Sequence, residues 1–294
     1  MRMKLSNSAL RDHVSTRTLR AGRTKHLALS ALGVCAALSI PGTAAADGDI
    51  RAAYAVTFAG LPFANATLDL ALRGSGYTAR VAYRTAGASR LLSNAAGSAA
   101  SSGAYKNGRL VPAAFDLEHR NGQRRQKVSL GMTEGAVKTM TVDPPLELTS
   151  GQLPIEPKHL TAIADPLSAL LISAVKVDGK SPASPCDRTL SVVDGLRRYD
   201  ARLEPQSTGN TTMKGFAGPT TICRVALTPV AGMIGGSNSR LADAGPIDIT
   251  FGRANRLDLY LPISLQARTG YGAVSVVLTD FADEVQTAAT PRPN

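Results

Sequence analysis

Apolar and polar residues alternate along most of the chain beyond position 50, which is the pattern of a β-strand with one buried face. The stretches 54–58, 66–72 and 77–85 alternate in this way, and Gly74-Ser75-Gly76 stands between the second stretch and the third. Glycines in a short link between two alternating runs are typical of a β-hairpin turn. The pattern therefore predicts antiparallel hairpins from the start of the folded region.

Further runs of this kind follow at short spacing, and Gly, Pro, Asn or Asp separates most of them. Roughly a dozen short strands favour an all-β sandwich or barrel, and alternation favours antiparallel pairing with one polar face. Residues 95–103 are nearly all Ala, Ser and Gly, and they fit either a loop or a strand of small residues. The further predicted strands are 110–119, 126–132, 137–142, 188–193, 198–203, 221–229, 247–251, 257–261, 264–268 and 273–279.

One segment has helical spacing instead. Apolar side chains stand at 167, 170, 171 and 174, Asp165 suits the N-cap, and Pro166 suits the first helical position. We predict one helix that begins near 160 or 166 and ends at 175. Its stripe of Leu167, Leu171 and Ala174 would pack on the sheet or plug one end of a barrel.

The N-terminus has the three parts of a secretory signal peptide. A basic region is followed by an apolar run over 27–40 and by Ala44-Ala45-Ala46. The apolar run is shorter than the roughly 20 residues of a membrane-spanning helix, although a single N-terminal anchor remains the alternative. Cys35 follows Val34, where a lipoprotein signal needs a small residue. We predict a signal peptide over 1–46 with cleavage after Ala46, a single β-rich domain over 47–287 and a disordered tail over 288–294.

The net charge is much smaller when the predicted signal peptide is left out. The whole chain of 294 residues has a formal net charge of +11, but the leader holds seven basic residues and one acidic residue, which leaves +5 on the remainder. The 7 Tyr and 6 Phe, with no Trp, are too few for the aromatic girdles of a membrane-spanning barrel or for a base-stacking surface. We therefore expect no nucleic-acid partner and no membrane span in the mature chain.

Two cysteines remain after the leader, Cys186 and Cys223. In an exported protein, two cysteines most simply form one disulfide bond. Two free thiols or a metal pair are the alternatives, but no Cys-x-x-Cys motif is present, and His119 and His159 are distant in sequence. We predict the disulfide and no metal site.

Motifs for catalysis are weak throughout. Gly179-Lys180-Ser181 lacks the earlier glycine of a phosphate-binding loop, and no G-x-S-x-G nucleophile motif occurs. A serine hydrolase would need Ser168 beside His119 or His159, which nothing in the sequence enforces. We expect no catalytic residues and no cofactor.

Charged residues gather mainly at predicted turns. Asp194-Gly195 is a preferred hairpin turn, so the nearby carboxylates need no catalytic role. One basic group surrounds Asn121-Gly122, and a second, smaller one is Arg197-Arg198. The simplest interpretation of both groups is a charged hairpin tip that resists edge pairing; contact with anionic lipid headgroups is the alternative. The carboxylates are Asp178, Asp187, Asp194 and Asp200, and the basic residues are Arg120, Arg124, Arg125 and Lys127, with a smaller pair at Arg197 and Arg198.

Several segments together resemble a known family. They include the opening hairpin over 54–72, DPLSALL at 165–171, VVDGLRRYD at 192–200, and the cysteines with Pro229-Val230-Ala231-Gly232 after the second. Over about 50–280 the chain resembles the bacterial periplasmic family called domain of unknown function 3108. The resemblance implies an exported, β-rich protein whose strands form a curved antiparallel sheet or an incompletely closed β-barrel. The family has no assigned activity, so it supplies no catalytic residues.

These observations lead to an expected function. We expect a periplasmic cell-envelope protein without catalytic activity that binds an apolar ligand such as lipid or serves as an envelope scaffold. Its partners would be lipid or another envelope protein. The alternative is a hydrolase that acts on an envelope polymer or ester.

Overall fold

The structure is a computed structural model, and it describes residues 47–91, 93–145, 147–148, 152–175, 184–232, 245–254, 256–270 and 272–285. The predicted signal peptide, the predicted tail and Gly179-Lys180-Ser181 lie outside these residues.

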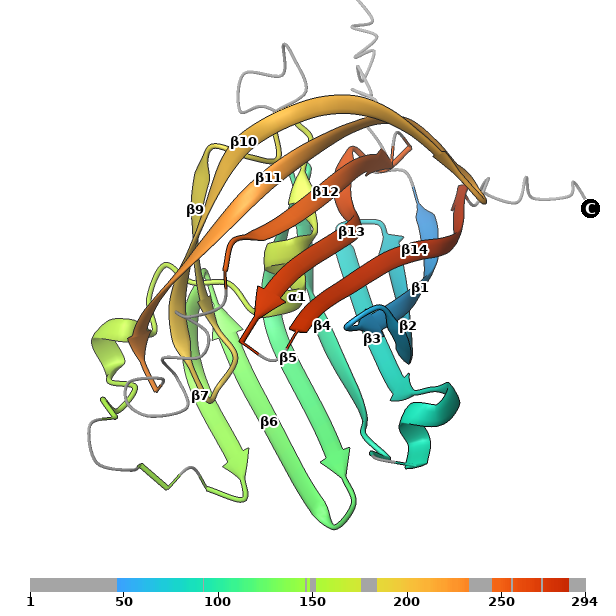
Figure 1. The fold of residues 1–294 in the computed structure, drawn as a ribbon. Coiled ribbons are helices and arrows are strands. Elements are labelled where there is room, and N and C mark those ends of the chain that lie inside the picture. Colours follow the sequence, from blue (N-terminus) through green and yellow to red (C-terminus); the bar gives the residue numbers. More distant parts are fainter. Residues whose placement is uncertain are drawn as a thin grey trace, which may run out of the picture. The chain divides into compact units, whose positions relative to one another are not determined.

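One curved antiparallel sheet forms the described part of the chain (Figure 1). Its strand order is β7-β6-β5-β4-β3-β2-β1-β14-β13-β12-β11-β10-β9, and the short strand β8 pairs with β13 off this path. The path has two ends, β7 and β9, so the sheet is not closed, as predicted for an incompletely closed barrel. The strands are β1 (Gly48–Phe58), β2 (Leu61–Arg73), β3 (Gly76–Thr85), β4 (Ala96–Lys106), β5 (Arg109–Asn121), β6 (Arg124–Thr133), β7 (Ala136–Asp143), β8 (Ile172–Ser173), β9 (Arg188–Val193), β10 (Arg198–Met213), β11 (Phe216–Ala231), β12 (Ile247–Ala254), β13 (Leu259–Thr269) and β14 (Gly272–Val285).

Two runs of hairpins meet at the first and last strands. β1 to β7 pair in sequence order, β9 to β14 do the same, and β1 pairs with β14 from Gly48 opposite Val285 to Phe58 opposite Val274. The β2–β3 turn falls at Gly74, as the sequence predicts.

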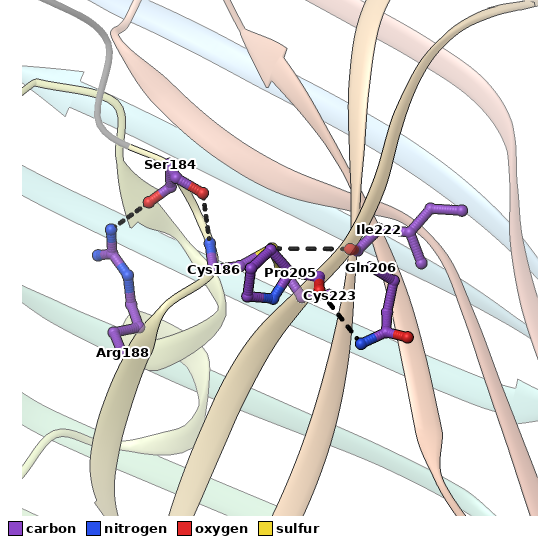
Figure 2. Close-up of a disulfide and its surroundings, with 7 residues drawn as sticks. All are labelled: Ser184, Cys186, Arg188, Pro205, Gln206, Ile222 and Cys223. Atoms are coloured by element: carbon purple, nitrogen blue, oxygen red, sulfur yellow. Dashed lines mark hydrogen bonds between the residues drawn. A yellow bond between two sulfur atoms is a disulfide. The ribbon is translucent and has the colours of Figure 1, made fainter.

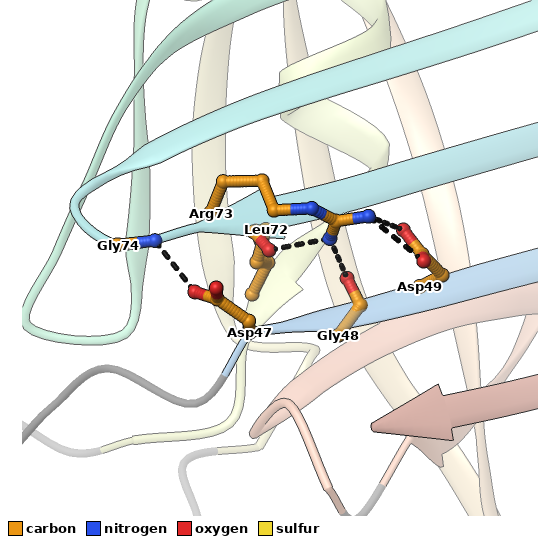
Figure 3. A network of polar contacts seen from close by, with 6 residues as sticks. All are labelled: Asp47, Gly48, Asp49, Leu72, Arg73 and Gly74. Atoms are coloured by element: carbon orange, nitrogen blue, oxygen red, sulfur yellow. Dashed lines mark hydrogen bonds and ion pairs between the residues drawn. The ribbon is translucent and has the colours of Figure 1, made fainter. Parts of the chain in front are cut away.

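The start of β1 is fastened to that turn by polar contacts (Figure 3). Arg73 donates two hydrogen bonds to Asp49, at 2.7 and 2.8 Å, and Gly74 N donates to Asp47 at 2.7 Å. These contacts are exposed, so each contributes little to stability, but they fix where the first strand begins.

The alternating pattern produces the core. In β2, Leu68, Leu70 and Leu72 are 4%, 1% and 1% exposed, whereas the residues between them face away from the core. Burying such a side chain contributes about 1.5–3 kcal/mol. On the inner face, buried side chains from both runs of hairpins pack together with Leu167 of the helix described next. They form one main hydrophobic cluster.

The helix is shorter than predicted. α1 spans Pro166–Leu170, with Asp165 as N-cap and Pro166 at its start as expected. It ends early because Ile172 and Ser173 pair with β13 as strand β8, and Ala174 N donates to Asp258 O at 2.8 Å. The prediction of a helix to residue 175 was therefore wrong: strand pairing satisfies the backbone groups that a longer helix would use.

Of the undecided stretch 95–103, residues 96–103 are part of β4. Its small residues are needed because a Cβ on Gly97 would lie 2.6 Å from the Tyr83 ring, and a Cβ on Gly103 would lie 2.1 Å from Val111 O. The predicted runs 257–261 and 264–268 are largely one strand, β13. The two longest strands, β10 and β11, continue further than predicted because they pair with each other out to Met213 opposite Phe216.

A crossing segment, defined as residues 152–175, lies on the connection from edge strand β7 to edge strand β9. On the β7 side, Val137 N donates to Leu160 O at 2.9 Å. On the β9 side, Ala164 N donates to Ser191 O at 2.8 Å. The segment therefore contacts both open edges of the sheet, and it carries α1 into the concave side (Figure 1).

Candidate functional site

A buried polar node attaches α1 to the sheet. Asp165 is 0% exposed, and its Oδ1 accepts from Leu167 N at 2.9 Å and from Ser168 N at 3.0 Å. Its Oδ2 accepts from the hydroxyl of Ser168 at 2.6 Å and from that of Ser101 on β4 at 2.9 Å. The carboxylate is thus satisfied by the helix on one side and by the sheet on the other.

Tyr77 completes the node. Its hydroxyl lies 2.8 Å from the Ser101 hydroxyl, and because Ser101 gives its single hydrogen to Asp165, Tyr77 must be the donor. Burial raises the pKa of Tyr77 above its ordinary value of 10.0, which keeps that donor protonated. We call Tyr77, Ser101, Asp165 and Ser168 the Asp165 node. It fixes α1 at one place on the inner face.

An apolar hollow of about 170 Å³ lies beside α1. Leu170, which is 36% exposed, lines it from the helix, and Tyr54 lines it from β1. Tyr54 donates its hydroxyl to Pro262 O at 2.8 Å, so its only polar side-chain atom is already satisfied. The hollow can take apolar groups with no polar wall atom to desolvate. The described residues that line it are Tyr54, Ala66, Leu68, Val81, Leu167, Leu170, Leu171, Pro262, Ser264, Leu265 and Val276.

The residues considered for a hydrolase do not meet. Ser168 donates to Asp165, whereas the Nδ1 of His119 is hydrogen-bonded to the Tyr83 hydroxyl, and that of His159 accepts from Glu156 N at 3.1 Å. His119 also lies four residues along β5 from Phe115, the strand partner of Ser101, a separation of about 13 Å. The Ser–His pair that the alternative function requires is therefore not assembled.

The two cysteines are placed together (Figure 2). The Sγ atoms of Cys186 and Cys223 are 1.93 Å apart, with a Cα–Cα distance of 5.5 Å. Both residues are buried, at 2% and 0% exposed, in a second hydrophobic cluster. The pair ties the segment that precedes β9 to the middle of β11, which agrees with the pairing predicted from the sequence.

The carboxylates near β9 are structural, as far as the structure describes them. Asp194 Oδ1 accepts from Leu196 N at 2.8 Å and from Arg197 N at 2.6 Å, so it holds a turn as predicted, and burial raises the pKa of its carboxyl. Asp178 lies outside the described residues.

The two basic groups differ from each other. Arg120, Arg124 and Arg125 are exposed around the β5–β6 turn, as expected for a charged tip. Arg198 is only 9% exposed and donates to Asp200 at 2.8 Å. The interpretation of Arg198 as a solvated tip residue was therefore wrong, because this side chain is paired and buried.

Among the described residues, no group of three or more His, Cys, Asp or Glu side chains lies close enough together to hold a metal ion. In the same part of the chain, no helix is long and apolar enough to cross a membrane.

The class of protein follows from these features: an open, β-barrel-like antiparallel sheet with a short helix fixed on its inner face. Within that class, residues 53–279 match the family described as protein of unknown function, DUF3108. The chain belongs to this family, which confirms the resemblance found from its sequence segments.

Solved structures show distant likeness. A beta-barrel-like protein of the domain of unknown function DUF1849 from Brucella abortus has a TM-score of 0.45 and 10% identity, with 83% of this chain and 100% of that chain covered. A hypothetical protein from Chlamydia trachomatis has a TM-score of 0.31 and 8% identity, with 85% and 92% covered. No curated protein matches the chain.

Sequence reasoning missed most of the residues that form the hollow. Leu167 and Leu171 were expected to pack inward, and Asp165 was identified as a cap. Tyr54, Ala66 and Val81 stood in predicted strands, but nothing marked them as neighbours of the helix. The alternating pattern predicted that these side chains lie on the same face of the sheet. It could not predict that the curvature of the sheet places this face beside α1.

Proposed function

We propose that this protein is a non-catalytic binding protein of the bacterial cell envelope, exported through its N-terminal leader, that holds the apolar part of a lipid. The apolar hollow beside α1 carries the proposal. At about 170 Å³ it is smaller than the roughly 300–1,000 Å³ of sites for whole drug-sized molecules, so it fits a portion of an acyl chain.

The wall of the hollow supports this proposal. The Asp165 node holds α1 in place, so the hollow is formed before any ligand arrives, and preformed sites lose less conformational entropy on binding. The exposed face of Leu170 gives an entering chain an apolar surface at the rim.

Export is tested by the site of cleavage. The protein would be purified from the periplasmic fraction of its own bacterium, and its N-terminus sequenced. We expect Asp47 as the first residue. An uncleaved chain in the cytoplasm would contradict the export part of the proposal.

Ligand binding is tested by mass spectrometry of lipids extracted from the purified protein. Ala66→Phe would fill the hollow, because Ala66 lines it and is paired with Tyr54 across β1 and β2. The matched control is Thr67→Phe, one residue further on the same strand and exposed. We expect co-purified lipid in the wild type and the control, and a loss of most of it in Ala66→Phe. No lipid in any of the three, or equal lipid in all three, would contradict the proposal.

A further inference from the structure

A second hollow of about 510 Å³ lies against other residues of the crossing segment. α1 contributes Ser168 and Ala169, and Leu171 just after the helix lines both hollows. The β4–β5 turn closes against the segment, since a Cβ on Gly108 would lie 2.7 Å from Val175. The described residues that line it are Arg109, Leu110, Ala164, Ser168, Ala169, Leu171, Ile172, Ser173, Val175, Arg188, Thr189 and Leu190.

The charged groups in this wall have one sign. Arg109 at the start of β5 and Arg188 at the start of β9 line the hollow, and no carboxylate among the described residues does. Asp187, the neighbour of Arg188 in sequence, is not part of the lining and is ion-paired with Arg202 at 2.9 Å. Within the described part of the chain, two cations therefore share a concave wall that no carboxylate lines.

Arg188 is partly desolvated and keeps an unused donor. One Nη donates to Ser184 O (Figure 2), whereas its Nε is shielded from solvent and has no acceptor in the described part of the chain. Burial lowers the pKa of Arg188, and the nearby charge of Arg109 lowers it further, against a smaller opposing effect of the Asp187 charge. An anion beside both guanidinium groups would relieve this repulsion and offer acceptors.

A third hollow differs because acidic and basic side chains both line it. It has about 500 Å³ over the opposite face of β3 to β6, and it mixes Arg80 and Lys127 with Asp69, Asp116 and Glu118. Opposite charges are available to one another there. The hollow with Arg109 and Arg188 lacks that compensation, which separates the two chemically.

The remaining wall is largely apolar. Leu110, Leu171, Ile172, Val175 and Leu190 line the hollow below the two arginines. Ser173 directs its hydroxyl to Val175 O at 3.4 Å, and the Ser168 hydroxyl is held by Asp165. A ligand that suits this wall has an oxyanion at one end and hydrocarbon at the other.

We propose that this hollow binds an anionic amphiphile, with its carboxylate or phosphate between Arg109 and Arg188 and its hydrocarbon chain against the leucine-rich wall. A guanidinium presents paired donors that match either oxyanion. The proposal concerns a second site and does not depend on occupancy of the apolar hollow.

The test is isothermal titration calorimetry on the delipidated full-length mature protein. The probes are dodecanoate, dodecyl phosphate, inorganic phosphate and the uncharged dodecyl maltoside, each below its micelle concentration. In the Ala66→Phe background, whose apolar hollow is filled, we expect both charged amphiphiles to bind and the maltoside to fail. Tighter binding of dodecanoate supports a fatty acid as the natural ligand, and tighter binding of dodecyl phosphate supports a phospholipid headgroup. Inorganic phosphate binding as tightly as dodecyl phosphate would overturn the amphiphile.

Variants assign the binding to this hollow. Arg109→Gln and Arg188→Gln should each weaken binding about tenfold or more, because each removes a charge-assisted contact. The matched control is Arg120→Gln, an exposed arginine at the other end of β5. Arg109 is itself exposed, so its variant tests the site even if Arg188→Gln fails to fold. Unchanged affinity in Arg109→Gln would overturn the proposal.

A further variant separates this proposal from the previous one. Ala66→Phe fills only the apolar hollow, so it should leave unchanged the part of the dodecanoate binding that depends on Arg109 and Arg188. Loss of dodecanoate binding in Ala66→Phe, together with no loss in the arginine variants, would assign the amphiphile to the apolar hollow and overturn the second site.

Discussion

Two of the attachments between the sheet and the connection from β7 to β9 differ in their chemistry. Near its middle, Asp165 accepts four hydrogen bonds from the helix and from β4 in a fully buried site. Near its end, Cys186 is placed for a covalent bond to Cys223 on β11. Hydrogen bonds of the first kind specify a position in the folded state, whereas a disulfide acts mainly on the unfolded chain. The two hollows that α1 lines lie beside the first attachment.

The largest effect is expected from Asp165→Ala. The change removes the helix cap and leaves buried donors of Ser101 and Ser168 without an acceptor, so the free energy of unfolding should fall by about 3–5 kcal/mol. Urea unfolding followed by circular dichroism measures it.

Two further variants frame that result. Asp165→Asn keeps one acceptor oxygen and should lose about half as much. Asp248→Ala removes a carboxylate whose ion pair with Arg224 is at the surface, at 3.0 Å, and should cost about 0.2–1 kcal/mol. A cost for Asp165→Ala no larger than for Asp248→Ala would show that the node does not stabilise the fold.

The next effect concerns the cysteines, which are 37 residues apart in the chain. For a loop of this length, the chain-entropy model gives roughly 4 kcal/mol as an upper value, and we expect about 2–4 kcal/mol from the bond. Thermal unfolding with and without reductant measures it. The doubly substituted Cys186→Ala/Cys223→Ala protein is the control, since reductant should not change its melting temperature. Equal melting temperatures for oxidised and reduced wild type would refute the bond.

A smaller effect than that of the disulfide is expected at neutral pH from Tyr77→Phe. The Ser101 hydroxyl keeps its bond to Asp165 and loses only the donor from Tyr77, so the cost should be about 1 kcal/mol. A cost above about 3 kcal/mol would mean that Tyr77 does more than donate one hydrogen bond.

Tyr77 also gives the node a pH dependence. Its folded-state pKa is raised above the ordinary 10.0, chiefly by burial, so its contribution is complete below pH 10 and falls as the pH rises beyond it. The slope for one tyrosine approaches about 1.4 kcal/mol per pH unit. Urea unfolding between pH 9 and 11 should show a shallower decline for Tyr77→Phe than for wild type. Identical slopes would contradict the assignment.

The local sequence pattern was sufficient to predict the positions of most strands. It was insufficient to predict which strands pair with each other. Alternation predicted β2 and β3 because one face of each is buried. It was silent for β4, where Ala, Ser and Gly stand on both faces and the need for small residues comes from Tyr83 and from Val111 on neighbouring strands. The end of the helix was misjudged for a similar reason, because Ile172 finds its pairing partner, Tyr260, far away in the chain.

The candidate sites were still less predictable. Asp165 was identified as a cap, but its partner Ser101 is 64 positions away. Arg109 and Arg188 were not singled out, whereas the conspicuous cluster around Arg124 lies on a solvated turn. A dense local cluster of charged residues indicates a solvent-exposed segment. The wall of a hollow, in contrast, is formed by single residues on different strands, which lie together only in the folded sheet.

The pairing of β1 with β14 has a consequence for how the chain folds during synthesis. Strands β1 to β7 can pair one after another as they emerge, because each neighbours the next in sequence. The outer edge of β1 cannot be covered until the last strand has been made, more than 220 residues later, since Tyr54 pairs with Leu278. For most of synthesis that edge is therefore an unpaired template, open to strands of other chains, so protection during this interval depends on factors outside the finished fold.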